Sequence, residues 1–113
     1  MCPSPLNLKI NNQLISQFRE YLELERHYSF YTVENYLRVI NQFNNFLAKT
    51  SERNLAEVDT PDVASFLAYL KTNSHLKRIS QLNRLSALKT FYRYLRKKGK
   101  IQKNPCDGIG GLR

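Results

Sequence analysis

Basic side chains dominate the stretch QLNRLSALKTFYRYLRKKGKIQKNP, residues 81–105, and they limit the chemistry that this chain can perform. The stretch contains eight Lys or Arg residues and no Asp or Glu. A helix needs some charge on its wet face, but a merely solvated face carries both signs. A surface with only positive charge suits a polyanion, with nucleic acid as the first choice and an anionic membrane surface as the second.

The net charge of +9 is unevenly distributed along the 113 residues. Residues 1–70 carry six Lys or Arg against eight Asp or Glu, whereas residues 71–113 carry twelve against Asp107 alone. A solubilising face remains the alternative interpretation of a single basic helix. A basic half of a domain favours polyanion binding.

The residue types of this chain give little indication of a catalytic or metal-binding site. The chain has only two histidines, His27 and His75, no Cys–His cluster with metal-ligand spacing and no Gly-rich phosphate loop. His27 lies where the first predicted helix ends, so we interpret it as a surface residue. Cys2 and Cys106 are expected to stay reduced without a functional role. We therefore predict no catalytic residue, no metal and no cofactor.

Two helices are predicted in the first half of the chain. Apolar residues repeat with helical period over residues 12–26 and again over 33–48, the second helix following Thr32 as its N-cap. The N-terminus MCPSPLNLKINN lacks the layout of a signal peptide, and no apolar run is long enough to span a membrane. A cytoplasmic protein with no membrane contact is expected.

Two further helices are predicted in the second half. Thr60 is the expected N-cap of the third, with Pro61 at its first position, and the fourth extends from about Ser80 to a C-cap at Gly99. The Pro and glycines of IQKNPCDGIGGLR indicate a terminal segment or linker. With no strand pattern in the sequence, the fold class is all-α, a bundle of four helices.

The polar faces of two helices are candidates for binding. The second helix places four amides, one Glu and one Arg opposite its apolar side; Asn and Gln suit adenine in the major groove and Arg suits guanine, although an ordinary solvated face is the alternative. Arg84 points towards the apolar side of the fourth helix, from where it either extends along the bundle edge or reaches a phosphate. The wet side of the fourth helix collects Asn83, Ser86, Lys89, Thr90, Arg93, Arg96 and Lys97.

Three sequence blocks match a known family. YTVENYLRVINQFNNFL, EVDTPDVASFLAYL and NRLSALKTFYRYLRKKGKIQKNP resemble, in order, the N-terminal core-binding domain of tyrosine recombinases, the phage-integrase and Xer-like family. The resemblance covers residues 12–105 and implies a four-helix, SAM-like orthogonal bundle that binds double-stranded DNA. Residues 1–11 would then be a flexible N-terminus, and residues 106–113 a linker towards a catalytic domain that is absent here.

The resemblance also implies specific contacts. The second and fourth helices would enter the major groove, and further recombinase protomers would assemble on the same DNA. The motif HLKR, residues 75–78, spells the family's His-x-x-Arg pair, but it lies in a loop of the DNA-binding domain and we reject it. Matched by position, the implied DNA contacts are Thr32, Asn35, Arg38, Ser80, Asn83, Arg84 and Ala87, with Ala87 offering an apolar contact to a thymine methyl group.

The sequence thus predicts a non-catalytic DNA-binding domain of a site-specific recombinase. The first alternative is a helical module whose basic face binds an acidic protein. The second, a membrane-surface module, is disfavoured because the core claims the apolar side of the basic helix.

Overall fold

The computed structural model describes residues 5–50, 54–73 and 78–106, with side chains for residues 9–50, 54–72 and 82–106. Four α-helices account for most of these residues, and no strand occurs among them. The predicted all-α class is therefore confirmed. The chain divides into two compact units, Met1–Leu55 (unit 1) and Ala56–Arg113 (unit 2), and each is described by itself.

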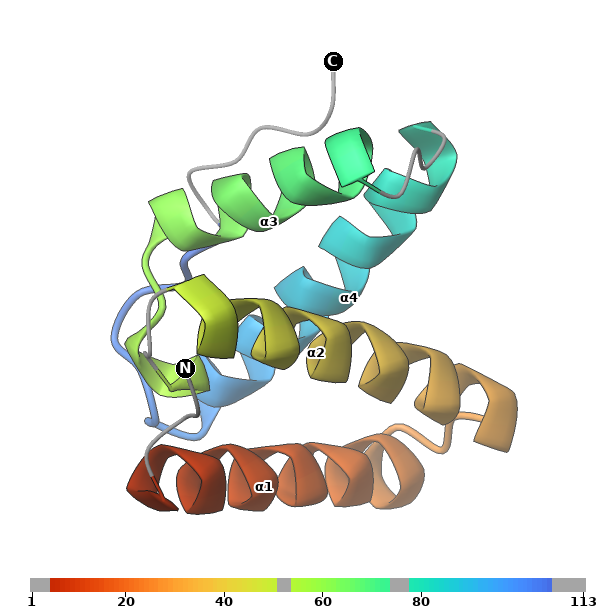
Figure 1. Ribbon diagram of the computed structural model, residues 1–113. Coiled ribbons are helices and arrows are strands. Elements are labelled where there is room, and N and C mark those ends of the chain that lie inside the picture. The colour runs from red at the N-terminus through yellow and green to blue at the C-terminus, as the bar shows by residue number, and fades with distance from the viewer. Residues whose placement is uncertain (1–4, 51–53, 74–77, 107–113) are drawn as a thin grey trace. The chain divides into compact units, whose positions relative to one another are not determined.

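Unit 1 is built from α1 (Pro5–Glu20), a π-helical turn η1 (Tyr21–Glu25) and α2 (Phe30–Thr50). The two α-helices pack against each other side by side and run in opposite directions (Figure 1). Apolar residues three or four positions apart form one buried side on each helix. The buried residues are Leu14, Phe18, Leu22, Val33, Leu37, Ile40, Phe43 and Leu47.

Helix α1 begins at Pro5, earlier than the predicted start near residue 12. Proline is favoured in the first turn of a helix, where its missing N–H costs nothing. Asn11 is buried; its amide donates to Asn44 Oδ1 at 2.7 Å, and its Oδ1 accepts from the Leu55 N–H at 2.8 Å. Residues 5–11, expected to belong to a flexible N-terminus, are helical here, and two long-range hydrogen bonds hold Asn11.

The helical segment of α1 and η1 ends close to the predicted position. The Arg26 N–H donates to Tyr21 O at 3.1 Å, and the Tyr28 N–H donates to Leu22 O at 3.0 Å. Between them, His27 takes a left-handed conformation with φ of 53°. His27 is exposed at the helix end, in the boundary position that the sequence indicated.

Helix α2 begins at Phe30, so the prediction of Thr32 as its N-cap is wrong. Ser29 caps the helix instead: its Oγ accepts the Thr32 N–H at 3.3 Å, and the two hydroxyl groups lie 3.0 Å apart. Both residue types suit an N-cap, and the sequence alone did not distinguish these two positions.

Unit 2 contains α3 (Thr60–Asn73) and α4 (Arg78–Lys97), which pack against each other; the 3₁₀ turn η2 (Leu55–Glu57) precedes them. Thr60 is the first residue of α3, so its prediction as N-cap is also wrong. Asp59 takes that role: the Asp62 N–H donates to Asp59 O, and the Asp59 N–H donates to Asp62 Oδ2, both at 3.0 Å. The second bond, in which the side chain of the third helical residue accepts the N–H of the capping residue, is one half of a capping box.

Gly99 ends α4, as predicted. Its φ is 75°, its N–H donates to Arg96 O at 3.1 Å, and the Lys100 N–H donates to Leu95 O at 2.9 Å. These two hydrogen bonds form a Schellman motif, which requires a left-handed residue and therefore favours glycine. At its other end α4 begins at Arg78, close to the predicted Ser80.

The segment that follows α4 returns to the start of α3. Asn104, Pro105 and Cys106 are buried, and Asn104 Oδ1 accepts the Cys106 N–H at 2.8 Å. Pro105 O accepts a hydrogen bond of 2.8 Å from the hydroxyl group of Thr60. Cys106 is a free thiol that belongs to this packed segment. The rest of the predicted linker, residues 107–113, lies outside the described residues.

Membrane-spanning helices and clusters of metal-binding side chains are both absent from the described residues. None of the helices described is long and apolar enough to cross a membrane. No group of three or more His, Cys, Asp or Glu side chains in the described part of the chain could hold a metal ion.

Candidate nucleic-acid interface

Burial divides the surface of α4 into two sides. Seven residues on one side are buried, namely Leu85, Ala87, Leu88, Phe91, Tyr92, Tyr94 and Leu95. At about 100° per residue these positions fill one arc of the helix, and the opposite arc is solvent-accessible. We call the accessible residues the α4 basic face; they are Asn83, Ser86, Lys89, Thr90, Arg93, Arg96 and Lys97, all exposed or half-buried.

The charge of the α4 basic face is positive throughout. Within the described residues, Lys89, Arg93 and Arg96 form no ion pair. Unit 2 as a whole carries twelve Lys or Arg against four Asp or Glu. Cations without an acidic partner keep their full charge available for phosphate groups.

Polar groups without charge precede the cations along this face. Asn83 and Ser86 lie in the early turns and are exposed. Thr90 is half-buried, and its hydroxyl donates to Ser86 O at 3.1 Å. The hydrogen of Thr90 is thus used within the helix, which leaves its oxygen as an acceptor. The exposed Asn83 amide retains both a donor and an acceptor.

Three predicted contacts on α4 have different outcomes. Ala87 is only 2% exposed, so its methyl group does not lie on the accessible face, and the predicted thymine contact is not supported. Arg84 is half-buried on the apolar arc, as its helical angle indicated. Ser80 lies in the first turns of α4, but its side chain is outside the described residues. In the rejected HLKR motif, residues 75–77 are also outside them, and Arg78 begins α4.

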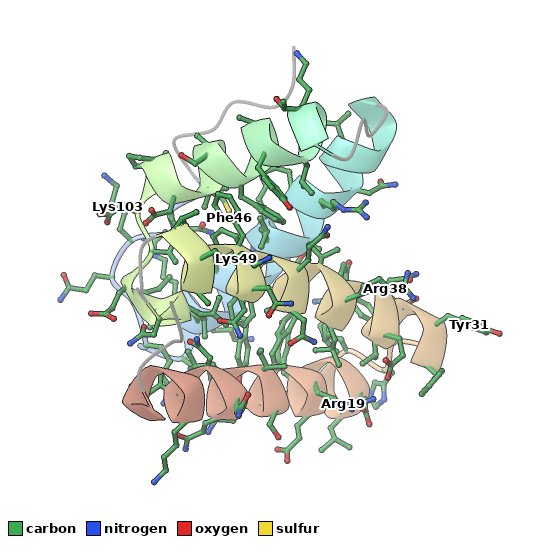
Figure 2. All side chains as sticks on the ribbon, viewed as in Figure 1. Arg19, Tyr31, Arg38, Phe46, Lys49 and Lys103 are labelled. Carbon is green, nitrogen blue, oxygen red and sulfur yellow. The ribbon has the colours of Figure 1, made fainter. Side chains whose placement is uncertain are left out.

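The exposed side of α2 forms a second polar surface. Positions seven apart in two interleaved rows, 31–38–45 and 35–42–49, lie along one line of the helix. Asn35 and Arg38 are exposed there, as predicted. Tyr31 and Lys49, which were not identified from the sequence, are exposed on the same helix (Figure 2). The heptad spacing was the signal that could have revealed them. We call this surface the α2 stripe; it comprises Tyr31, Asn35, Arg38, Gln42, Asn45 and Lys49.

One acidic residue, Glu34, lies beside the α2 stripe. Its carboxylate accepts a charge-assisted hydrogen bond from Arg19 Nη2 of α1, and Arg19 Nε also binds Glu23 Oε1 at 3.0 Å. The guanidinium group offsets the negative charge that Glu34 brings to this side of α2. This contact joins residues of two helices, so no local pattern indicated it.

Thr32, one of the predicted DNA contacts, takes part in the cap at the start of α2. The hydroxyl group of Thr32 shares a hydrogen bond with Ser29 Oγ, and its side chain is half-buried. The neighbouring Tyr31 is 79% exposed. Tyr31 is therefore the most exposed large hydrophobic or aromatic side chain in this turn.

Comparison with known proteins identifies a family model and several relatives that match most of this chain. The family model described as "Phage integrase, N-terminal SAM-like domain" matches residues 15–99. A tyrosine recombinase XerC of Pediococcus pentosaceus is 44% identical over 96 residues, which cover 84% of this chain and 32% of that protein. No solved structure shows significant similarity.

Two further relatives are also named tyrosine recombinase XerC. The protein of Lacticaseibacillus casei is 39% identical over 94 residues, covering 82% of this chain and 31% of its own length. The protein of Syntrophus aciditrophicus is 34% identical over 105 residues, covering 87% and 34%. This chain spans about a third of the length of the curated relatives that it matches.

Proposed function

This chain belongs to the phage integrase family, as its N-terminal SAM-like domain, and from this premise we propose that it binds the double-stranded DNA of a recombination site without cutting it. The observation that carries the proposal is the α4 basic face, on which every charged side chain is a cation. A surface of this kind supplies the electrostatic part of DNA affinity.

The α4 basic face combines two kinds of DNA contact. Arg93, Arg96 and Lys97 lie in its last turns, where they would grip phosphates and position the helix. Asn83 lies in the early turns, where it would contact a base edge in the major groove. Phosphate contacts hold the domain on any duplex, and base contacts select one sequence.

The α2 stripe would add to this readout from unit 1. Asn35 can present a donor and an acceptor to adenine, and Arg38 can bind guanine with two parallel hydrogen bonds. Arg38 has no ion-pair partner among the described residues, which supports its availability for DNA.

We assign the breaking and joining of strands to another part of the parent protein. The relatives named tyrosine recombinases are about three times as long as the matched segment. In our proposal this domain holds one side of the duplex, a separate catalytic domain supplies the nucleophilic tyrosine, and further protomers assemble on the same site.

The test is a titration of a fluorescent duplex by anisotropy over a range of salt concentrations. If the cations of the α4 basic face contact phosphates, the logarithm of affinity falls linearly with the logarithm of salt concentration, with a slope of about −0.9 per phosphate contacted. A flat response excludes nucleic acid as the partner. An acidic peptide that binds equally well in excess DNA would favour the protein-interaction alternative.

A further inference from the structure

Tyr31 is the most exposed of the large hydrophobic and aromatic residues in the described part of the chain. It is 79% exposed, whereas Tyr92 and Tyr94 are buried and Tyr21, Tyr28 and Tyr36 are half-buried in this structure. Water solvates an aromatic ring poorly, and tyrosine is enriched where one protein meets a partner with both apolar and polar groups.

The position of Tyr31 on α2 indicates which partner it faces. It lies eighteen residues before Lys49, which is five full turns of 3.6 residues, so both point along the same line of the helix. Arg38 lies on the same side, two turns after Tyr31. Figure 2 shows Tyr31 extending from the first turn of α2, with Arg38 and Lys49 further along the helix. Tyr31 is therefore the first residue of the α2 stripe and faces the same partner as Arg38 and Lys49.

Phe30 provides the contrast. It is almost equally exposed, at 71%, but it is turned about 100° from Tyr31 around the helix. Its ring helps to line a hollow of unit 1 together with Arg19, Glu23 and other residues, none of which belongs to the α2 stripe. The two rings are arranged edge to face with their centroids 6.3 Å apart, yet only Tyr31 lies on the polar face.

The chemistry of the first turn of α2 assigns a role to the tyrosine hydroxyl. Ser29 and Thr32 use their hydroxyl groups for each other and for the cap. The Tyr31 hydroxyl, at the end of a long and exposed ring, has the reach and the donor to bind a phosphate oxygen, while the ring covers the adjoining sugar.

We propose that Tyr31, rather than Thr32, is the DNA contact at the start of α2, and that its hydroxyl group donates a hydrogen bond to a backbone phosphate. This inference rests on the proposed function. A neutral donor releases no counterion, so the contact adds affinity on every duplex without steepening the salt dependence.

The experiment compares Tyr31→Phe, Tyr31→Ala and the matched control Phe30→Ala, all in the full chain. Thermal unfolding by circular dichroism verifies that each variant folds. Anisotropy then measures affinity for a half-site selected from random duplexes and for a scrambled duplex. Tyr31→Phe should lose roughly three- to tenfold on both duplexes, the loss expected for one hydrogen bond, with an unchanged salt slope. Tyr31→Ala should lose at least as much, and Phe30→Ala should bind like wild type.

Three results would overturn the inference. Wild-type affinity of Tyr31→Phe on both duplexes removes the hydroxyl contact. A loss confined to the selected half-site shows a base contact in place of a phosphate contact. Equal losses of DNA affinity in Tyr31→Ala and Phe30→Ala show that removing either ring disturbs the start of α2, with no specific contact from Tyr31. If wild type itself fails to bind any duplex, the proposed function fails first, and the two failures are thereby distinguished.

Discussion

The hydroxyl group of Thr60, the first residue of α3, donates a hydrogen bond of 2.8 Å to the carbonyl oxygen of Pro105, 45 residues later in the chain. The bond is partly buried, and the adjoining Asn104 and Cys106 are buried as well. It fixes the segment after α4 against the start of α3, so the ordered part of unit 2 extends beyond the helix end at Gly99.

Replacing Thr60 with Val removes this hydrogen bond while keeping the shape of the side chain. Because the Pro105 carbonyl would lose its partner in a partly buried place, the free energy of unfolding should fall by about 1 kcal/mol. Urea denaturation measures the change. Thr72→Val, at an exposed position of the same helix, is the control, and an equal effect in both variants would show that the hydrogen bond contributes nothing.

Gly99→Ala tests the end of α4. The left-handed φ of 75° is unfavourable for any residue with a Cβ atom, although no heavy atom lies within 4 Å of the position that this Cβ would take. The cost is therefore in the backbone, and the free energy of unfolding should fall by about 1 kcal/mol. Gly99→Asn should lose less, since Asn tolerates this conformation. Equal stability of Gly99→Ala and wild type in thermal unfolding would contradict the motif.

Glu34→Gln tests the electrostatics beside the α2 stripe. If the α2 stripe contacts DNA, removing a negative charge beside it should raise affinity about two- to threefold at low salt, on all duplexes. Glu23→Gln makes the same charge change on the other carboxylate that binds Arg19, which belongs to η1 and not to α2, and should have a smaller effect. Anisotropy titrations that give equal gains for both variants would show that only net charge matters.

Asn83→Ala and Arg93→Ala separate sequence reading from phosphate binding on the α4 basic face. Asn83→Ala should cost about 1–3 kcal/mol on the selected half-site and much less on a scrambled duplex, because a base contact is lost. Arg93→Ala should weaken binding to both duplexes alike and reduce the magnitude of the salt slope by about one unit. Equal weakening of both duplexes by Asn83→Ala would mean that this turn does not read bases.

Tyr92 should make unit 2 sensitive to alkali. Burial, and to a lesser extent the negative charges of Cys106 and Asp62, raise the pKa of Tyr92 well above its ordinary value of 10.0. The fold thus favours the neutral phenol, so its contribution to stability is complete below about pH 10 and is lost as the pH rises further.

The measurement compares urea unfolding at about pH 8 and about pH 11. Tyr92→Phe should lose less stability than wild type between these two values, because it has no phenol to ionise. Tyr31→Phe, at an exposed position, should lose as much as wild type. If Tyr92→Phe and wild type lose stability equally, ionisation of Tyr92 does not contribute to alkaline unfolding.

Properties that depend on neighbouring residues could be predicted from the sequence. The helical period of apolar residues located all four helices, and it identified the wet side of α4 because burial follows the same period. Gly99 was recognised as a C-cap, since only glycine adopts a left-handed conformation without cost. The three matching blocks indicated the family to which the chain belongs.

Properties that depend on residues far apart were decided by the tertiary structure. Ala87 lies only about 40° around α4 from the exposed Asn83, and packing rather than helical period buries it. Asn11 is ordered by Asn44 and Leu55, each more than thirty residues away. Helical period describes one element at a time, whereas burial and hydrogen bonding require the partner, which only the folded chain brings into contact.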